Sequence, residues 1–524
     1  MSKLLTRNSS WIFLTALSLA GIGLVFLVTS KYGAGLAGDS IHYVSVAENL
    51  LKGRGFIDYA QMPLILFPPL LSVLLAGLAW IFRADVFLVG WGLNAVLWGV
   101  NIFLSGYFLK RVFSAKPIYF YLATLIIFLS PSSLTMHASV LSDPLFLTFT
   151  LLFFIAGEFY IEKPDWKPFL ALFVVAMLAP PLRFSGFTHI VTGGLIILSA
   201  HGKKLLKSIP LAGIFGALTL VPTILWIYLH NYLPYGTWWG VSNSVGADPL
   251  VNTLQFLRKI MYWFLPYRPI SQTGFVEPVV ILAVILIILL LINKRQNWLD
   301  WAKQFLRPAL VSCMLLSFVY LTSSILNIQT GDHKILFSDR YFVIIFVPIL
   351  VLIFMTFDRL ILPHISLRMD YLQAALIILF LLWSSYPISK IYKYVRVSLV
   401  EGENGYNQYN TRAFHESKIL EQAQSLLEKE PEARLYSNIG PAVWFFTRHL
   451  MILPPAQDVP RTKDQLKADL AGWPYDRPGY YVWFEPDPFE LFMPLKDLYL
   501  VADMEVVEKT SDGVIVRVWA RESQ

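Results

Sequence analysis

The chain has 524 residues, of which 56% are hydrophobic and only 15% are charged. Soluble globular proteins carry about 25% charged residues, so too few are present here to cover a water-facing surface, and we predict a polytopic α-helical membrane protein. The net charge of +7 comes mostly from short basic clusters between apolar runs, which indicates loops facing anionic lipid and no nucleic-acid partner, and the single cysteine excludes an intramolecular disulfide framework.

Eleven apolar stretches come near the length of about 20 residues that crosses a hydrocarbon core. In chain order they are residues 11–30, 86–109, 117–136, 144–161, 168–182, 185–201, 208–229, 275–292, 308–327, 341–357 and 371–388. The first follows Lys3 and Arg7 like a signal peptide, but its full-span length favours an uncleaved helix. One more run, residues 68–82, is short for a span and is typical of a re-entrant or interfacial segment.

The positive-inside rule assigns the two faces of the membrane. If residues 68–82 do not cross and the N-terminus is cytoplasmic, the densest basic clusters all fall inside. These clusters include Lys110, Arg111 and Lys116; Lys163 and Lys167; Lys203, Lys204 and Lys207; Lys294, Arg295, Lys303 and Arg307; and Arg359 and Arg368. Arg258 and Lys259 are a smaller pair left outside. We therefore expect eleven spans with an outward C-terminus.

Residues 389–524 differ in character from the rest of the chain. Charged residues become frequent, no run is long enough to span, and one helical pattern at 412–430 precedes the strand-like segments "ARLYSN", "YYVWF" and "VIVRVWA". We predict two domains: a transmembrane domain over residues 1–388 and a small extracytoplasmic α/β domain over residues 389–524.

The segment after the first span, "GDSIHYVSVAENLLKGRGF" (residues 38–56), is rich in ionisable side chains. Its apolar residues recur with amphipathic helical spacing. One interpretation is an interfacial helix for which Asp39 or Ser40 is simply the N-cap. The other is that the Asp39 carboxylate acts as a general base at the membrane surface.

Three more ionisable residues stand at predicted outer ends of spans. Asp143 lies in "LSDPLF", where the following proline is typical of a helix start and Asp143 of a helix cap. Arg183 lies in "PLRFSG" and Arg340 in "SDRYFVIIFVP". Arginines at span ends often snorkel to the interface, but the charge bias disfavours them on the outer side, and a guanidinium group is well suited to binding a lipid-linked phosphate.

Five segments, in order along the chain, resemble the GT-C superfamily of integral-membrane glycosyltransferases. They are "GDSIHYVSVAENLLKGRGF…PPLLSVLLAGL", "LSDPLF", "PLRFSG", "SDRYFVIIFVP" and "RLYSNIGPAVWFFTRHLMILPP". The nearest branch is that of the bacterial enzymes related to protein mannosyltransferases and the lipid A aminoarabinose transferase. The resemblance covers most of the chain and implies a GT-C-like fold, with surface helices in the first outer loop.

The resemblance also implies a reaction. A sugar on a polyprenyl phosphate would pass, with inversion, to an acceptor hydroxyl at the outer face of a prokaryotic plasma membrane. Asp39 would be the general base, although Ser40 stands where the family often has a second acid. Donor phosphate binding falls to Arg340, Tyr341 and Arg183. Supporting or substrate-binding roles fall to His42, Tyr43, Glu48, Arg54, Asp143, His333 and Asp339.

Metal use stays open at the level of the sequence. Some members of the family bind a divalent ion such as Mg²⁺ or Mn²⁺, and Asp39 and Asp143 are the candidate ligands here, with His333 as a further one. Other branches need no metal.

Two alternative functions belong to other classes. A transporter or lipid flippase predicts ionisable residues near the membrane midplane, whereas most here lie at span ends, with Glu158 and His189 as exceptions. A sensor or assembly protein would use the outer domain to bind a partner, and its acidic residues would only cap helices. Neither the sugar nor the acceptor, whether glycan, lipid or protein, is indicated by the sequence.

Overall fold

The computed structural model describes residues 2–201, 205–238, 249–265, 276–292, 295–326, 338–365, 368–457, 463–474, 477–487 and 489–521. The chain forms two compact units, each assembled from separate stretches of sequence. The helical unit comprises Met1–Ser30, Ile65–Leu71 and Trp91–Leu399. The mixed unit comprises Lys31–Leu64, Ser72–Gly90 and Val400–Gln524.

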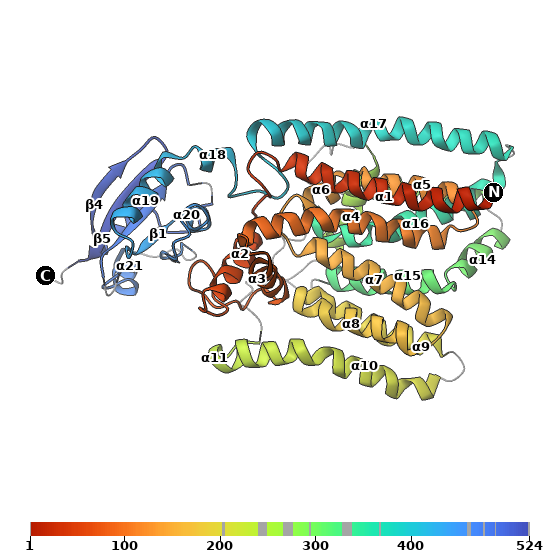
Figure 1. The fold of residues 1–524 in the computed structure, drawn as a ribbon, viewed down its shortest axis with the longest axis horizontal. Coiled ribbons are helices and arrows are strands. Elements are labelled where there is room, and N and C mark those ends of the chain that lie inside the picture. The colour runs from red at the N-terminus through yellow and green to blue at the C-terminus, as the bar shows by residue number, and fades with distance from the viewer. Residues whose placement is uncertain are drawn as a thin grey trace. The chain divides into compact units, whose positions relative to one another are not determined.

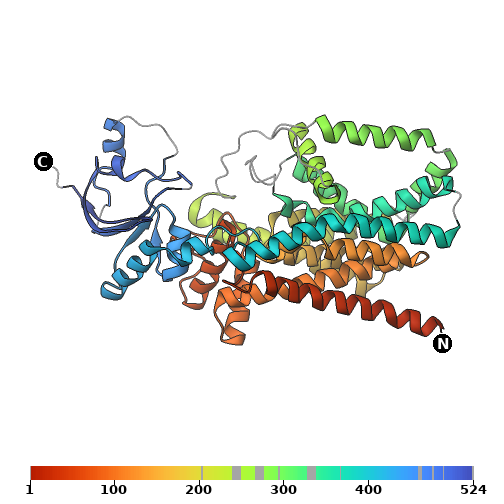
Figure 2. The same cartoon turned by 90° about the horizontal axis from the view of Figure 1, so that it is seen from above.

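Long helices running side by side make up the helical unit (Figure 1). They are α1 (Ser2–Val28), α4 (Val86–Val112), α5 (Pro117–Phe128), α6 (Pro131–His137), α7 (Asp143–Glu162), α8 (Trp166–Leu182), α9 (Phe187–Ala200), α10 (Leu205–Trp226), α12 (Pro249–Phe264), α13 (Val276–Ile292), α14 (Arg295–Gln304), α15 (Pro308–Ile325), α16 (Phe346–Thr356) and α17 (Met369–Glu401). Helix α7 packs against α8, α9 and α15, and Figure 2 shows the same bundle from above.

Seven described helices are long and apolar enough to cross a membrane, or eight if α5 and α6 form one span. The α5–α6 pair is bent by 53°. Pro131 begins α6 and the Ser130 hydroxyl accepts the Ser133 N–H at 3.3 Å, so the second helix starts with its own cap. Three other predicted spans fall on the shorter apolar helices Trp166–Leu182, Phe184–Ala200 and Val279–Leu290. The prediction of a polytopic helical protein is confirmed.

The run at residues 68–82 forms helix α3 (Leu70–Phe82), which has 13 residues. At 1.5 Å per residue it is about 20 Å long, short of the roughly 30 Å of a hydrocarbon core. Its length favours the interfacial position that the charge pattern predicts.

A five-stranded sheet lies in the mixed unit, with strand order β2-β1-β3-β5-β4. The strands are β1 (Leu435–Ser437), β2 (Met451–Ile452), β3 (Gly479–Phe484), β4 (Ala502–Lys509) and β5 (Gly513–Ala520). Strand β1 pairs in parallel with β2 and β3, whereas β3–β5 and β5–β4 are antiparallel. The three strand-like segments of the sequence lie on β1, β3 and β5. Strand β4 is at the edge and mostly exposed, so it lacks the apolar alternation that would predict it.

The mixed unit also contains seven described helices. They are α2 (Gly38–Leu51), α3, α18 (Arg412–His415), α19 (Lys418–Lys429), α20 (Gly440–Thr447), α21 (Lys463–Asp469) and α22 (Leu495–Leu498). The Ser417 hydroxyl caps α19, and the Asp512 carboxylate from the β4–β5 turn accepts the Ile419 N–H at 3.2 Å. These hydrogen bonds hold the pKa of Asp512 below its usual range, although partial burial acts in the opposite direction.

The segment Lys31–Leu64, which follows the first long helix, belongs to the same compact unit as Val400–Gln524. The Asn410 amide donates to the Tyr32 and Ala34 carbonyls at 2.7 and 2.9 Å, and the Asn407 side chain accepts the Leu36 N–H at 3.1 Å. Helix α17 runs through residue 388 without a break, and the units divide near residue 400. The predicted domain boundary at 388/389 stays a prediction.

Close packing of α1 against α4 generates a stability prediction. A Cβ on Gly99 of α4 would lie 2.7 Å from the Ile22 side chain and 2.9 Å from the Ser18 carbonyl oxygen of α1, whereas a Cβ on Gly92 of the same helix would meet nothing within 4 Å. We expect Gly99→Ala to destabilise the protein by about 1–3 kcal/mol, because the two helix backbones would have to separate. Gly92→Ala is the matched control. Thermal unfolding in detergent measures both variants, and equal midpoints would contradict the packing.

Candidate active site

Asp143 is the first residue of α7, and its side chain is fully buried. One carboxylate oxygen, Oδ2, lies 2.8 Å from Arg183 Nη1 and 4.0 Å from Arg340 Nη1. The two arginines come from separate elements, so one buried carboxylate joins the start of α7 to both of them. Ser142 is the N-cap of α7 and makes no side-chain cap hydrogen bond. The Asp143 carboxylate lies at the positive end of the α7 dipole, where a negative charge is favoured, and it pairs there with the arginines.

Arg183 lies between α8 and the short helix η1 (Phe184–Gly186), with an extended backbone. Its Nη1 donates a hydrogen bond to the Ser142 hydroxyl at 3.0 Å. The turn that carries it is tight, because a Cβ on Gly186 would lie 2.2 Å from the backbone carbon of Ala179. Only glycine fits this close to the Ala179 backbone without a shift. Gly186 therefore allows the end of α8 to pack closely against η1, and this turn directs Arg183 toward α7.

Arg340 lies in the short helix η5 (Asp339–Tyr341), and its side chain is 10% exposed. Its Nη2 donates to the Tyr341 hydroxyl at 2.9 Å. The guanidinium carbons of Arg340 and Arg183 lie 5.0 and 5.5 Å from the centre of the Tyr341 ring, within the range of cation–π attraction. Tyr320 of α15 donates to the Tyr341 carbonyl at 2.8 Å and thereby fixes the η5 backbone. We name Asp143, Arg183, Arg340 and Tyr341 the arginine cluster.

Asp339 faces a different set of partners in the helical unit. Its carboxylate lies 2.7 Å from the Lys259 ammonium of α12 and accepts the Ser132 hydroxyl at 3.0 Å. The sequence analysis did not assign a role to Lys259. The sequence did hold an indication of a role for Lys259, because Arg258 and Lys259 are the basic pair that the positive-inside rule leaves on the predicted outer face.

Asp39 lies in the first turn of α2 and is half-buried in the mixed unit. The start of this helix is held by other groups: the Ser40 hydroxyl accepts the Ala37 N–H at 3.0 Å, and the Gln408 side chain accepts the Gly38 N–H at 3.1 Å. Burial, followed by the charge of the Asp39 carboxylate, raises the pKa of Tyr409 to about 12. Asp39 is thus close to a buried phenol that stays protonated at neutral pH.

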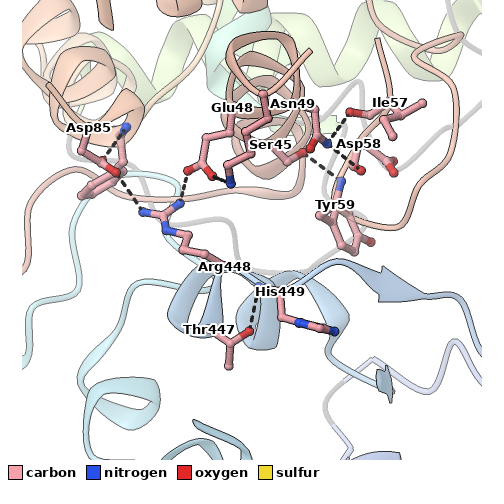
Figure 3. A network of polar contacts seen from close by, with 12 residues as sticks. Ser45, Glu48, Asn49, Ile57, Asp58, Tyr59, Asp85, Thr447, Arg448 and His449 are labelled. Carbon is pink, nitrogen blue, oxygen red and sulfur yellow. Dashed lines mark hydrogen bonds and ion pairs between the residues drawn. The ribbon is translucent and has the colours of Figure 1, made fainter. Parts of the chain in front are cut away.

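Helix α2 is tied to the loop that follows it. His42 Nδ1 lies 3.0 Å from the Asp58 carboxylate, which also accepts the backbone N–H groups of Ala60 and Met62 at 2.8 and 2.9 Å. The Asn49 amide donates to the Ile57 and Asp58 carbonyls (Figure 3). These bonds fix residues 57–62 against α2. Tyr43 is buried beneath the helix, and Arg54 is exposed.

Glu48, at the other end of α2, is held by a residue that the sequence analysis did not single out. Arg448 Nη1 lies 2.7 Å from Glu48 Oε1, and its Nη2 lies 3.6 Å from the Asp85 carboxylate (Figure 3). Lys52 pairs with Glu48 at 3.3 Å. Arg448 ends α20 with a positive φ of 56°, a left-handed conformation that is strained for a residue with a side chain. No local pattern indicates this pair, because 400 residues separate its members.

Of the three candidate metal ligands, the structure describes the surroundings of Asp39 and Asp143. Asp143 already faces two guanidinium groups within 4.0 Å, and a divalent cation beside that carboxylate would meet both positive charges. The surroundings of Asp143 therefore do not fit a metal ion. Among the residues that the structure describes, no three histidine, cysteine, aspartate or glutamate side chains gather as a metal site. His333 lies outside the described residues, and Asp39 and Asp143 belong to different compact units.

Comparison with known proteins gives a match in structure alone. No protein-family model and no curated protein sequence matches the chain. The crystal structure of ArnT from Cupriavidus metallidurans in the apo state covers 98% of this chain and 98% of its own, with a TM-score of 0.60 and 15% sequence identity. The chain has the fold of ArnT. The structure of that ArnT bound to undecaprenyl phosphate covers 97% of this chain and 98% of its own, with a TM-score of 0.57 and 16% identity.

The ArnT-like fold confirms the GT-C-like architecture that the sequence resemblance implies. The match extends over nearly the whole length of both chains, so the transmembrane helices and the C-terminal sheet are both included. The roles of the individual site residues stay predictions.

The Arg448–Glu48 pair generates a testable prediction. We expect Arg448→Ala to lower stability by about 1.5–3 kcal/mol, because the mostly buried Glu48 carboxylate would lose its charge-assisted hydrogen bond. Adding Glu48→Gln to this variant should recover part of the loss, since the uncompensated charge is then removed. Thermal unfolding of the single and double variants measures the coupling.

The control for this cycle is an exposed ion pair of the same unit. Lys418 lies 2.9 Å from Glu421, with both side chains more than three-fifths exposed, so Lys418→Ala should lower stability much less than Arg448→Ala. Strictly additive losses in Arg448→Ala and Glu48→Gln would contradict a direct interaction between the two side chains.

Proposed function

We propose that the chain is a glycosyltransferase that moves a sugar from a polyprenyl-phosphate donor to an acceptor hydroxyl at the outer face of a prokaryotic plasma membrane. The observation that carries this proposal is the full-length structural match to ArnT, including an ArnT that binds undecaprenyl phosphate. The multi-pass helical architecture supports it, because a donor with a long isoprenoid tail needs a protein embedded in the bilayer.

The arginine cluster is the proposed site of the donor phosphate. A guanidinium group matches phosphate oxygens with two parallel donors, and Arg183 and Arg340 come from two separate elements to the same carboxylate. Asp143 holds both arginines before the donor arrives, so little reorganisation is needed when negative charge develops on the departing phosphate. The Tyr341 ring and hydroxyl keep Arg340 in place.

Asp39 is the proposed general base. Its carboxylate takes the proton of the acceptor hydroxyl, whose oxygen bonds to the anomeric carbon while the bond from that carbon to the phosphate oxygen breaks. Attack from the face opposite the phosphate inverts the anomeric centre. The lipid phosphate is already a good leaving group, so the reaction needs no acidic residue like that of a glycosidase.

The orientation follows from the charge pattern of the chain. The N-terminus is placed in the cytoplasm and the C-terminal sheet outside, because this arrangement puts the densest basic clusters on the cytoplasmic face. The partly exposed His42, which the buried Asp58 holds at 3.0 Å, then lies on the outer side, where an acceptor arrives. Tyr43, Glu48, Arg54 and Asp339 remain proposed supporting residues.

The base assignment is tested with Asp39→Asn. We expect transfer to fall by a factor on the order of 10² or more, because the amide does not accept the hydroxyl proton, while binding of undecaprenyl phosphate is kept. Transfer is measured as loss of lipid-linked sugar from a panel of undecaprenyl-phosphate sugars incubated with candidate acceptors in proteoliposomes. Asp464→Asn, which changes an exposed carboxylate of the same unit, is the control. Full transfer by Asp39→Asn would refute the assignment.

The role of the arginine cluster in phosphate binding is tested with Arg340→Lys and Arg183→Lys. Each variant keeps the positive charge but loses the two parallel N–H donors of the guanidinium group. We expect kcat to fall by about 10²–10³ and undecaprenyl phosphate to bind more weakly. Arg396→Lys changes an exposed arginine of α17 and should leave both quantities unchanged. Native mass spectrometry measures lipid binding independently of the sugar. Wild-type affinity for undecaprenyl phosphate in both variants would overturn the role of the arginine cluster.

A further inference from the structure

A pocket of about 80 Å³ lies in the helical unit, lined by the end of α4, the starts of α5 and α15, Gln304 at the end of α14, and the last turn of α16 with the short helix η7 (Phe357–Ile361) that follows it. This volume is enough for several water molecules, and therefore for a group of phosphate size. The pocket takes no part in the proposed reaction. Its polar lining comes from Lys116, Tyr119, Gln304, Arg307, Asp358 and Arg359.

The charges around this pocket are unbalanced. Three basic residues from three separate elements face one carboxylate, that of Asp358, which leaves an excess of two positive charges. Asp358 is already supplied with donors, since it pairs with Lys116, accepts the Tyr119 hydroxyl at 3.1 Å and lies 3.5 Å from Arg359 Nε. Arg307 is held at the rim by its bond to the Val112 carbonyl at 3.2 Å. The cations are thus positioned by protein contacts in the absence of any ligand.

Two helix starts add to the positive potential. Lys116 is the N-cap of the 12-residue α5 and Arg307 is the N-cap of the 18-residue α15, and neither makes a side-chain cap hydrogen bond. Each helix has a proline in its first turn. The positive ends of two helix dipoles therefore meet at the rim of a cavity that also gathers three cations.

This pocket is remote from the arginine cluster. Helix α7 has 20 residues, so its two ends lie about 30 Å apart. Asp143 is at its start, whereas Glu162 at its end lies 3.3 Å from Arg111, the neighbour of the pocket residue Val112. The pocket therefore lies at the end of the helices opposite the proposed active site, on the face that the charge pattern assigns to the cytoplasm.

We infer that this pocket binds the phosphate diester of an anionic phospholipid headgroup at the cytoplasmic leaflet, one that carries no ammonium group to offset the charge of the phosphate. Three cations and two helix starts favour an anion, and the location at the ends of membrane-crossing helices is the depth of a lipid headgroup. Apolar side chains of Phe113 and Met355 line the same pocket and suit the glycerol and upper acyl carbons. Bound lipid would join α4, α5, α15 and α16 at this end of the unit.

The experiment uses the full-length protein purified in a neutral detergent, with phosphatidylglycerol, phosphatidylcholine or inorganic phosphate added. The variant is Arg307→Gln with Arg359→Gln, which keeps the Lys116–Asp358 pair and so leaves no buried carboxylate alone. The control is Lys163→Gln with Lys167→Gln, which removes two exposed charges of the α7–α8 loop on the same predicted face. Thermal unfolding and native mass spectrometry measure binding.

We expect phosphatidylglycerol, but not phosphatidylcholine, to raise the unfolding midpoint of the wild type and of the control. The pocket variant should bind phosphatidylglycerol roughly thirtyfold more weakly, since each basic residue near an anionic headgroup contributes about a factor of five. A comparable effect of inorganic phosphate would show that the phosphate group alone is recognised. An effect of the lipid only would show that the glycerol and acyl parts are needed as well.

Three outcomes would overturn the inference. They are no response of the wild type to either phosphate probe, an unchanged response in the pocket variant, and an equal loss in the control, which would indicate diffuse charge attraction. If the pocket variant does not fold, hydrogen exchange of the wild type decides instead. Phosphatidylglycerol should then slow exchange in residues 112–119 and 304–311, and unchanged exchange there would refute the site.

Discussion

The buried carboxylate of Asp143 is the group on which the organisation of one end of the helical unit depends. An isolated charge at this depth would be costly, and Arg183 at 2.8 Å compensates it. The same carboxylate lies 4.0 Å from Arg340, so elements from three parts of the chain meet at this one buried charge. The tight turn at Gly186 and the Tyr320–Tyr341 bond serve that meeting, because each fixes the backbone that carries one of the arginines.

The mixed unit has a corresponding constraint. The loop at residues 31–37 has backbone groups that no regular secondary structure satisfies, and side-chain amides from residues 407–410 supply the partners. Arg448 adds an ion pair at the far end of α2. Helix α2 is thereby held at both ends by residues near the C-terminus. If Asp39 is the base that we propose, these residues of the C-terminal part of the chain position it through α2.

Ionisable groups gather at both ends of the helical unit, as a structural ion pair at one end and as the arginine cluster at the other. Glu158, which the sequence analysis noted as an ionisable residue inside a span, lies 3.0 Å from Arg111 near the end of α7, and this is a structural pair at one end of the helices. The arginine cluster gathers at the opposite end. A transport pathway would instead place such groups near the midplane. The ion pairs that the structure describes in the helical unit thus gather at the two ends of its helices. His189, the other exception, is a buried imidazole 3.2 Å from the Thr150 hydroxyl of α7 and has no charged partner among the described ion pairs.

The sequence by itself determined the helical class of the protein, the approximate ranges of its spans and three of its five strands. These features depend on local composition: an apolar run of span length satisfies its own backbone hydrogen bonds as a helix, and the buried strands carry dense β-branched and aromatic residues. Strand β4 was not predicted, because it lies at the edge of the sheet and its mostly exposed side chains need no apolar pattern. The partners of Asp143, Asp339 and Glu48 were decided only by the tertiary structure. Ion pairs such as Arg448–Glu48 join positions hundreds of residues apart, and no periodicity along the chain records which charges the fold brings together.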